Sequence, residues 1–305
     1  MNAIEIRNLS KSFRGMYALD HFHMTVPVGA IYGFIGENGS GKSTTEKLIC
    51  GHLVPDEGEI KLFGKDYTDA GVRVRVGALI ENAGCFPSSS VYQNLMMQAI
   101  NLNLKHPKEE ISRVLQIVRM EESANIKFKS CSLGMKQRIG IAMALLGNPA
   151  LLILDEPING LDTDGMRIMR EILVDITKKY STTVLISSHI LGELEKIATH
   201  YGIIRSGKMI QEISAKEMEQ RTRVFVSIKT KDMKRAKSVL QKEFHNVREE
   251  EEYLRVYDVD DTERMVDYLY QNGHVVSEIK KNKIGLEEYY MELMAKKEES
   301  YGSSK

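Results

Sequence analysis

The chain has 305 residues, of which 42% are apolar and 28% are charged. This length exceeds that of one average domain, so we expect one main domain and a smaller appended one. Lys plus Arg and Asp plus Glu both number 42, which excludes a whole-protein electrostatic attraction to nucleic acid or anionic lipid. The apolar content is ample for a buried core, so disorder across the chain is not expected.

The number of cysteines and the N-terminal residues indicate the cellular compartment in which the protein is expected. Cys50, Cys85 and Cys131 are too few and too irregularly spaced for a disulfide framework or a zinc site, which suits a reducing cytosol. No run of about 18 apolar residues occurs, and residues 1–7 contain no apolar signal core. We therefore expect a protein that neither spans a membrane nor is secreted through one.

The first two thirds of the chain alternate strand and helix patterns, which favours an α/β sheet. Short apolar runs between turn residues predict buried parallel strands, at 31–35, 76–80, 151–154 and 184–187. A helix is expected over 43–50. Another is expected over 163–180, where apolar residues recur at helical spacing and the methionines belong to the core. These residues are Met166, Met169, Ile172, Leu173 and Ile176.

The pattern changes near Arg223, after the charged and mixed segment 208–222. Alternating and helical periods predict strands at 223–229, near Val247, at 253–257 and at 274–279, and helices at 232–244 and 262–272. The order β-α-β-β-α-β is typical of a small ferredoxin-like α+β domain. An amphipathic helix at 286–297 and a frayed tail at 298–305 close the chain. We expect domains at 1–215 and 222–297.

The segment between the strand at 31–35 and the helix at 43–50 matches the pattern G-x-x-x-x-G-K-S/T. It comprises Gly36, Glu37, Asn38, Gly39, Ser40, Gly41, Lys42, Ser43 and Thr44. Glycines let successive backbone N–H groups converge on phosphate oxygens, Lys42 neutralises the β and γ phosphates, and the Ser43 hydroxyl reaches Mg²⁺. The sequence therefore predicts a P-loop that binds MgATP.

Two carboxylates, Asp155 and Glu156, end the apolar strand at 151–154. Asp155 is expected to hold Mg²⁺, usually through water, and Glu156 to polarise the water that attacks the γ-phosphate. The alternative is a strand that simply ends in two solvated acids. Because a P-loop is present in the same chain, we favour the catalytic interpretation.

Further motifs follow in a fixed order around this strand. They are Ser130-Cys131-Ser132-Leu133-Gly134-Met135-Lys136-Gln137-Arg138, Asp155-Glu156-Pro157-Ile158-Asn159-Gly160-Leu161-Asp162 and Ser187-Ser188-His189. With the P-loop, this set resembles the ATP-binding cassette (ABC) family of transporter ATPases over about residues 1–215. The resemblance implies ATP hydrolysis by a homodimer that holds two ATP molecules at its interface.

The resemblance also assigns individual residues. Phe13 matches the aromatic that stacks on adenine, with Tyr17 as the runner-up. Ser132 and Gly134 match the signature-loop groups that contact the γ-phosphate held by the opposite subunit. Asp162 matches an aspartate that faces the dimer interface, and His189 matches the switch histidine. Taken alone, Phe13 is more often a core residue and His189 more often a satisfied surface histidine.

The sequence departs from the family pattern in two places. The usual L-S-G-G-Q reads Cys131-Ser132-Leu133-Gly134-Met135, which retains the serine and the second glycine. Glu81 stands where most members have a metal-binding glutamine, so it is a third candidate metal ligand beside Ser43 and Asp155; the alternative is an exposed strand-end acid. Together with the small C-terminal domain, these departures resemble the subgroup that exports peptide antibiotics, including bacitracin and lantibiotic immunity transporters.

Three functions are weighed. The first is a transporter ATPase docked on a separate membrane permease, hence cytoplasmic and peripheral on the inner face of the plasma membrane. The second is a non-transport cassette ATPase acting on DNA or ribosomes; such relatives usually carry coiled coils or two cassettes, and the neutral charge speaks against nucleic acid. The third is a regulatory module without turnover, which Glu156 and His189 argue against. The sequence does not reveal the transported substrate, because cassette ATPases do not line the transport path.

Overall fold

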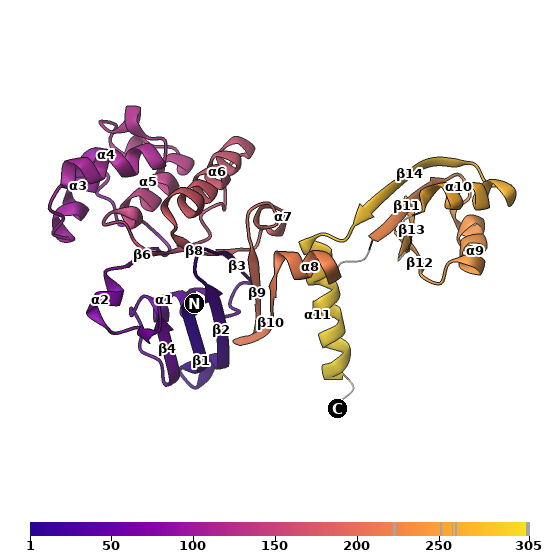
Figure 1. Ribbon diagram of the computed structural model, residues 1–305, viewed down its shortest axis with the longest axis horizontal. Coiled ribbons are helices and arrows are strands. Elements are labelled where there is room, and N and C mark those ends of the chain that lie inside the picture. The colour runs from indigo at the N-terminus through magenta and orange to yellow at the C-terminus, as the bar shows by residue number, and fades with distance from the viewer. Residues whose placement is uncertain (222–223, 251, 258, 260, 303–305) are drawn as a thin grey trace. The chain divides into compact units, whose positions relative to one another are not determined.

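The computed structural model describes residues 1–221, 224–250, 252–257, 259 and 261–302. By its contacts the chain divides into two compact units, Met1–Ala215 and Lys216–Lys305 (Figure 1). The expected strand start at Arg223 and domain start at Thr222 lie outside the described residues. Each unit is described separately below.

A six-stranded sheet, ordered β10-β9-β3-β8-β7-β6, forms the centre of the first unit. Its strands are β3 (Ile31–Ile35), β6 (Val76–Leu79), β7 (Leu151–Asp155), β8 (Thr183–Ser188), β9 (His200–Arg205) and β10 (Lys208–Ser214). All neighbours pair in parallel except β9 and β10, which are antiparallel. The apolar runs of β3, β7 and β8 are buried, as expected for strands that other elements cover on both faces.

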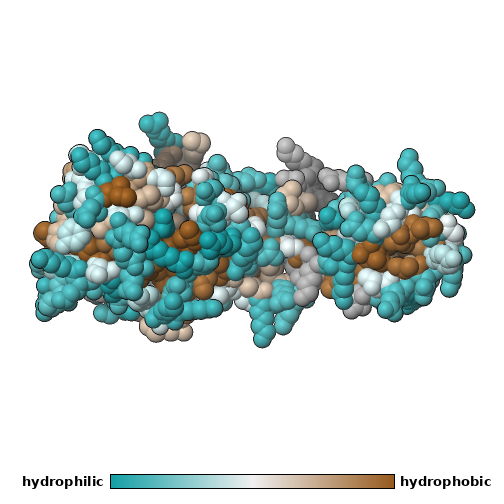
Figure 2. Space-filling model, turned by 90° about the horizontal axis from the view of Figure 1, so that it is seen from above, coloured by the Kyte–Doolittle hydropathy of each residue, from teal (hydrophilic) through white to brown (hydrophobic). Residues whose placement is uncertain are grey.

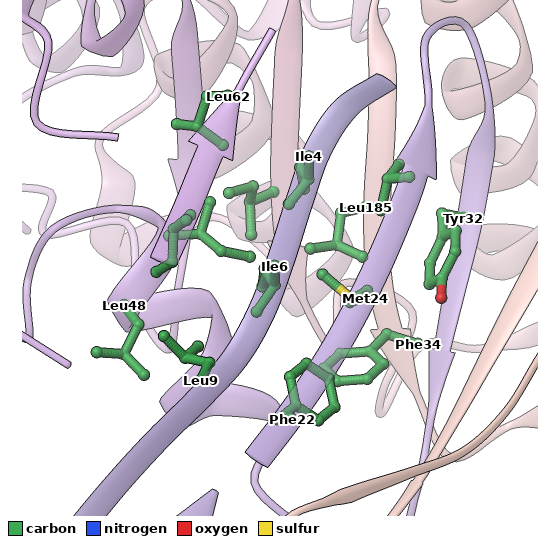
Figure 3. Close-up of a cluster of buried hydrophobic side chains, with 14 of the residues drawn as sticks. Ile4, Ile6, Leu9, Phe22, Met24, Tyr32, Phe34, Leu48, Leu62 and Leu185 are labelled. Carbon is green, nitrogen blue, oxygen red and sulfur yellow. The ribbon is translucent and has the colours of Figure 1, made fainter. Parts of the chain in front are cut away.

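A second, antiparallel sheet of order β2-β1-β4-β5 packs against the central sheet. It comprises β1 (Asn2–Phe13), β2 (Met16–Pro27), β4 (Glu57–Leu62) and β5 (Lys65–Asp66). Figure 3 shows the core that the two sheets share, in which Phe22 of β2 faces Phe34 of β3. The centroids of these rings are 6.0 Å apart. This core fixes the carboxyl end of β3, where the glycine-rich loop begins.

Helices complete the first unit. In Figure 1, α3, α4 and α5 gather on the side of the central strands away from the antiparallel sheet. The helices are α1 (Lys42–Ile49), α2 (Ala70–Arg73), α3 (Val91–Asn101), α4 (Pro107–Ile117), α5 (Leu133–Leu145), α6 (Thr163–Tyr180) and α7 (Leu191–Leu194), with 3₁₀ turns at Glu121–Ser123 and Phe128–Ser130. In α6, Met169 is fully buried whereas Met166 is only half-buried, so the expectation of core methionines is correct for Met169 alone.

The second unit contains α8 (Ala215–Arg221) and the succession β-α-β-β-α-β. Its elements are β11 (Val224–Thr230), α9 (Met233–Glu243), β12 (Val247–Glu250), β13 (Tyr253–Tyr257), α10 (Thr262–Gln271) and β14 (Val276–Lys283). The strands form one antiparallel sheet of order β12-β13-β11-β14. Val226, Ile228, Leu240 and Leu269 share the core between this sheet and the two helices.

The last helix, α11 (Leu286–Gly302), runs past its expected end at Lys297. The segment from Glu298 to Gly302 thus has a helical backbone, while the expected frayed tail at 298–305 stays a prediction. The physical reason is that Lys and Glu, which dominate 296–299, have high helix propensity, and no Gly or Pro intervenes before Gly302. Residues 303–305 lie outside the description.

The visible faces of both units carry mainly hydrophilic side chains with smaller apolar patches, as is typical of globular proteins (Figure 2). Within the described part of the chain, none of the helices combines the length and apolar character that crossing a bilayer requires.

Candidate nucleotide site

The glycine-rich loop leaves the carboxyl end of β3, and α1 begins at Lys42. A Cβ at Gly36 would lie 2.6 Å from the Ile204 carbonyl oxygen, and one at Gly41, whose φ is +113°, would lie 2.7 Å from the Ala18 carbonyl oxygen. These positions therefore require glycine. Lys42 Nζ, which is buried, donates to the carbonyl oxygens of Gly36 at 2.7 Å and Glu37 at 3.2 Å, so the lysine is held across the loop.

Asp155 lies at the carboxyl end of β7 between two hydroxyl groups. Ser43 Oγ donates to its Oδ2 at 3.2 Å, and Ser187 Oγ donates to its Oδ1 at 2.8 Å. Parallel pairing of β7 with β8 places Asp155 opposite Ser187. The loop, β7 and β8 thus meet at one edge of the sheet, where α/β proteins bind their ligands.

Glu156 follows Asp155 with a left-handed backbone, φ +49°. Its N–H donates to Ser187 Oγ at 3.1 Å, and its Oε2 lies 2.7 Å from His189 Nδ1. Because a carboxylate only accepts, Nδ1 carries the hydrogen in this pair. A non-glycine residue with positive φ is uncommon and often marks a functional position.

A pocket of about 240 Å³ joins these groups. It is lined by Ala18, Asn38, Gly39, Gly41, Lys42, Ser43, Thr44, Asp155 and Glu156. The close glycine backbone suits a phosphate chain, and the oxygens of Ser43 and Asp155 are ligands that Mg²⁺ prefers. The residues thus have the chemistry that a magnesium-bound triphosphate requires. Ser40, which belongs to the same loop, is buried, and its hydroxyl has no hydrogen-bond partner among the described residues.

Glu81 lies outside this pocket. It follows β6 with φ +63°, and its Oε1 accepts from Lys47 Nζ at 2.7 Å, while 64% of its side chain is exposed. The Lys47 ammonium lowers the pKa of this carboxyl below its ordinary value. Glu81 lines a neighbouring pocket of about 480 Å³ together with Leu79, Phe128 and Lys136. The structure does not bring Glu81 to Asp155.

The aromatic candidates are exposed at the hairpin of β1 and β2. Phe13 is 44% exposed and Tyr17 is 66% exposed, so neither is a core residue. Lys11 Nζ lies 5.6 Å from the centroid of the Phe13 ring. Both rings are free to stack on a planar group.

The signature-loop residues lie at the start of α5, apart from the pocket. Ser132 is the N-cap of α5 and accepts from Met135 N at 3.3 Å, and Asp162 is the N-cap of α6 and accepts from Gly165 N at 2.8 Å. A Cβ on Gly134 would lie 3.6 Å from Leu161 Cδ2, so the two motifs contact each other. Neither Ser132, Gly134 nor Asp162 lines the 240 Å³ pocket of the same chain.

Two neighbours of Asp155 were given no role by the sequence. Ser187 belongs to the motif Ser187-Ser188-His189, but its contact with Asp155 comes from the pairing of β7 with β8. Glu46 on α1 is fully buried, and its pKa is raised well above its ordinary value by burial and then by the charge of Asp155. The only sequence signal for Glu46 is an acid within a helix that starts at the loop.

In the central sheet β3 runs into this loop, and β7, which β8 separates from β3, ends in an acid that the loop residue Ser43 contacts. This arrangement defines a P-loop ATPase of the α/β class. The protein-family model described as "ABC transporter" matches residues 19–159. The chain is 34% identical over 297 residues to the bacitracin transport ATP-binding protein BcrA of Bacillus licheniformis, covering 95% of this chain and 97% of that one. It is 38% identical to the lantibiotic transport ATP-binding protein SrtF of Streptococcus pyogenes, covering 68% and 90%.

Solved cassettes share the fold. CbiO1 of Clostridium perfringens, described as part of the ABC transporter complex cbiONQ, has a TM-score of 0.66 at 27% identity over 72% of this chain and 91% of its own. The cassette MJ0796, solved as a dimer with ADP and Pi, has a TM-score of 0.63 at 21% identity over 70% of this chain and 98% of its own. The chain belongs to the ABC transporter family as one of its ATP-binding subunits. It is thus an ATPase whose hydrolysis is coupled to transport.

Proposed function

We propose that this chain powers a separate membrane permease that exports a peptide antibiotic or a similar amphiphile. The observation that best supports ATP hydrolysis is the position of Asp155, which precedes Glu156. Asp155 accepts hydrogen bonds from Ser43 of the loop and from Ser187 of β8. This arrangement supports magnesium-dependent phosphoryl transfer.

The roles follow from chemistry. Backbone N–H groups of the loop and the Lys42 ammonium would hold the phosphates. The loop residues that take part are Gly36, Asn38, Gly39, Ser40, Gly41, Lys42, Ser43 and Thr44. Ser43 and Asp155 would hold Mg²⁺, with Glu81 as a third ligand after a loop rearrangement that breaks its pair with Lys47. Bound Mg²⁺ offsets the negative charge on the phosphate oxygens. Glu156 would orient the attacking water, His189 would orient Glu156, and Phe13 would stack on adenine.

A homodimer is part of the proposal. None of the residues Ser132, Gly134 and Asp162 lines the 240 Å³ pocket of its own chain, although Gly134 lies close to Leu161, the neighbour of Asp162. This placement supports contact of these residues with the nucleotide of a second copy. MJ0796 and this chain share the cassette fold, and MJ0796 is solved as a dimer. Two ATP molecules would then lie between the two copies.

The substrate class rests on the relatives. BcrA matches 297 residues, which extend through the second unit, whereas the SrtF match of 209 residues is no longer than the first unit. The extent of the match therefore favours a bacitracin-type peptide over a lantibiotic. Because this chain would power a permease in the membrane, we propose that it is located in the cytoplasm, at the inner face of the plasma membrane.

The second unit has the element and strand order of a ferredoxin-like fold, and we infer that residues 222–297 form an accessory domain beside an ATP-binding domain at 1–215. Within its described residues no phosphate-binding loop occurs. We propose that this domain stabilises the dimer or tunes turnover.

Co-production tests the transporter assignment. Cells would carry the chain with or without a candidate permease, and Glu156→Gln would be the matched control. We expect the chain in the membrane fraction only when the permease is present, and bacitracin resistance only with wild-type Glu156. Equal membrane recovery without the permease, or equal resistance with Glu156→Gln, would reject the proposal.

A further inference from the structure

Glu46 is a buried acid whose carboxyl is close enough to Asp155 for the charge of Asp155 to act on it. It lies on α1, three positions after Ser43, and has no exposed surface. Neither carboxyl oxygen has a hydrogen-bond partner among the described residues. Buried polar side chains are hydrogen-bonded in the large majority of cases, so an unpartnered carboxyl requires an explanation.

The groups around Glu46 belong to the ATP site. Asp155, Ser187 and Lys42 are the polar residues whose charge or hydroxyl acts on its carboxyl. Lys42 donates to the loop carbonyls of Gly36 and Glu37. The Ser187 hydroxyl has one hydrogen, which it donates to Asp155 Oδ1 at 2.8 Å. The Ser187 hydroxyl, the donor next to Glu46, is therefore already bonded to Asp155.

Neither carboxyl oxygen of Glu46 forms a hydrogen bond with the described residues that would stabilise the fold. Leu48 and Ile49, later in α1, belong to the apolar core, and burying a carboxyl without a partner is unfavourable. A residue that opposes the local packing preference beside a reaction centre indicates a functional role.

We propose that Glu46 is a positioning residue of the ATP site that accepts the Ser187 hydroxyl when Asp155 turns to the divalent cation. In the structure the hydroxyl donates to Asp155. When the cation, directly or through water, occupies the Asp155 oxygens, the hydroxyl rotates to Glu46 and no longer competes with the metal. Glu46 thus strengthens cation binding without touching the cation. This inference rests on the proposed function, because it assumes that Asp155 serves Mg²⁺.

The test compares Glu46→Leu, which removes the acceptor, with Glu46→Gln, whose amide oxygen still accepts from Ser187. Binding of a fluorescent methylanthraniloyl ATP analogue is titrated with Mg²⁺, and the melting temperature is measured without nucleotide. We expect Glu46→Leu to melt no lower than wild type and to need about tenfold more Mg²⁺, because loss of an outer partner of a ligand costs about tenfold or more in metal affinity. Glu46→Gln should stay within about threefold of wild type.

A double variant tests whether Glu46 acts on Mg²⁺ binding through the Ser187 hydroxyl. In a Ser187→Ala background there is no hydroxyl to redirect, so adding Glu46→Leu should leave the Mg²⁺ requirement unchanged. The backbone oxygen of Ser187, 3.2 Å from Glu156 N, keeps that contact in the alanine variant. A full tenfold change in this background would overturn the proposal. Glu46→Met, unbranched like glutamate, replaces the leucine variant if that one does not fold.

The remaining outcomes separate this inference from the proposed function. If the wild type fails to bind the analogue with Mg²⁺, the proposed function is wrong. If the wild type binds and Glu46→Leu has the same Mg²⁺ requirement, only the role of Glu46 is wrong. A large drop in the nucleotide-free melting temperature with an unchanged Mg²⁺ requirement would make Glu46 a purely structural residue and also overturn the inference.

Discussion

His189 Nδ1 lies 2.7 Å from Glu156 Oε2, although the two residues follow different strands, β8 and β7. Half of the His189 side chain is exposed, whereas the Glu156 side chain is 22% exposed. The histidine therefore reaches the carboxylate from the solvent side and fixes its orientation. The two residues are 33 positions apart in the sequence, and parallel pairing of β7 and β8 brings them together.

We predict that His189→Ala slows ATP hydrolysis by about tenfold or more while MgATP binding persists, because the variant loses the group that orients Glu156. Steady-state hydrolysis and analogue binding are measured side by side. His189→Gln, which keeps a donor, should retain more activity than the alanine variant. Equal rates for wild type and His189→Ala would remove His189 from the site.

Glu81→Gln should keep hydrolysis within about tenfold while its Mg²⁺ affinity is weaker, so that more Mg²⁺ is needed. Glu81→Ala should lose more activity, because the alanine has no oxygen ligand. The rate is measured against Mg²⁺ concentration for both. Glu81 pairs with Lys47 and its side chain is exposed, so the test decides between a recruited ligand and a surface acid. Two curves identical to wild type would exclude Glu81 from the site. Equal losses would mean that the carboxylate charge itself is needed.

Gly77→Ala should destabilise the first unit by about 1–3 kcal/mol or more, because overpacked side chains force backbone shifts. A Cβ on Gly77 of β6 would lie 2.0 Å from the carbonyl oxygen of Ala144 in α5. The matched control is Gly192→Ala, since a Cβ there meets nothing within 4 Å. Denaturant midpoints of both variants are compared with wild type. A Gly77 variant as stable as the control would contradict the packing of β6 against α5.

A chain that ends at Gln220 should still bind MgATP, because all the loop and carboxylate groups of the site lie in the first unit. Analogue binding is measured on truncated protein whose folding is verified by circular dichroism. Turnover or dimer stability is expected to change. A folded truncation that cannot bind nucleotide would count against two separate domains.

The parallel strands β3, β6, β7 and β8 were predictable because each is a short apolar run that ends at turn or acidic residues. β9 (His200–Arg205), which pairs in parallel with β3, was not predicted, because it has a polar residue at each end and a glycine within it. The antiparallel sheet was not predicted. Its two longest strands, β1 and β2, pair with several shifts of register. Asn8 and His21 have φ of +49° and +47° within them. These interruptions destroy the two-residue alternation on which a strand prediction depends.

The site residues that were predictable are those that lie next to each other in the sequence. The loop is a single segment with a fixed spacing, and Asp155 and Glu156 end one strand, so the sequence displays them directly. The association of Glu46 with Ser187 and Asp155 joins α1, β8 and β7, and only the fold brings them together. The pair of Glu81 with Lys47 likewise joins two segments and is absent from any local pattern.

If Glu156 orients the water that attacks ATP, Glu156→Gln should bind MgATP without hydrolysing it at the wild-type rate. ATP hydrolysis is measured at saturating MgATP, and the oligomeric state is followed by gel filtration. We predict that hydrolysis falls by a factor of about 10² or more while MgATP stays bound, and that the variant elutes as a dimer which dissociates when ATP is removed. Turnover close to that of the wild type would contradict it.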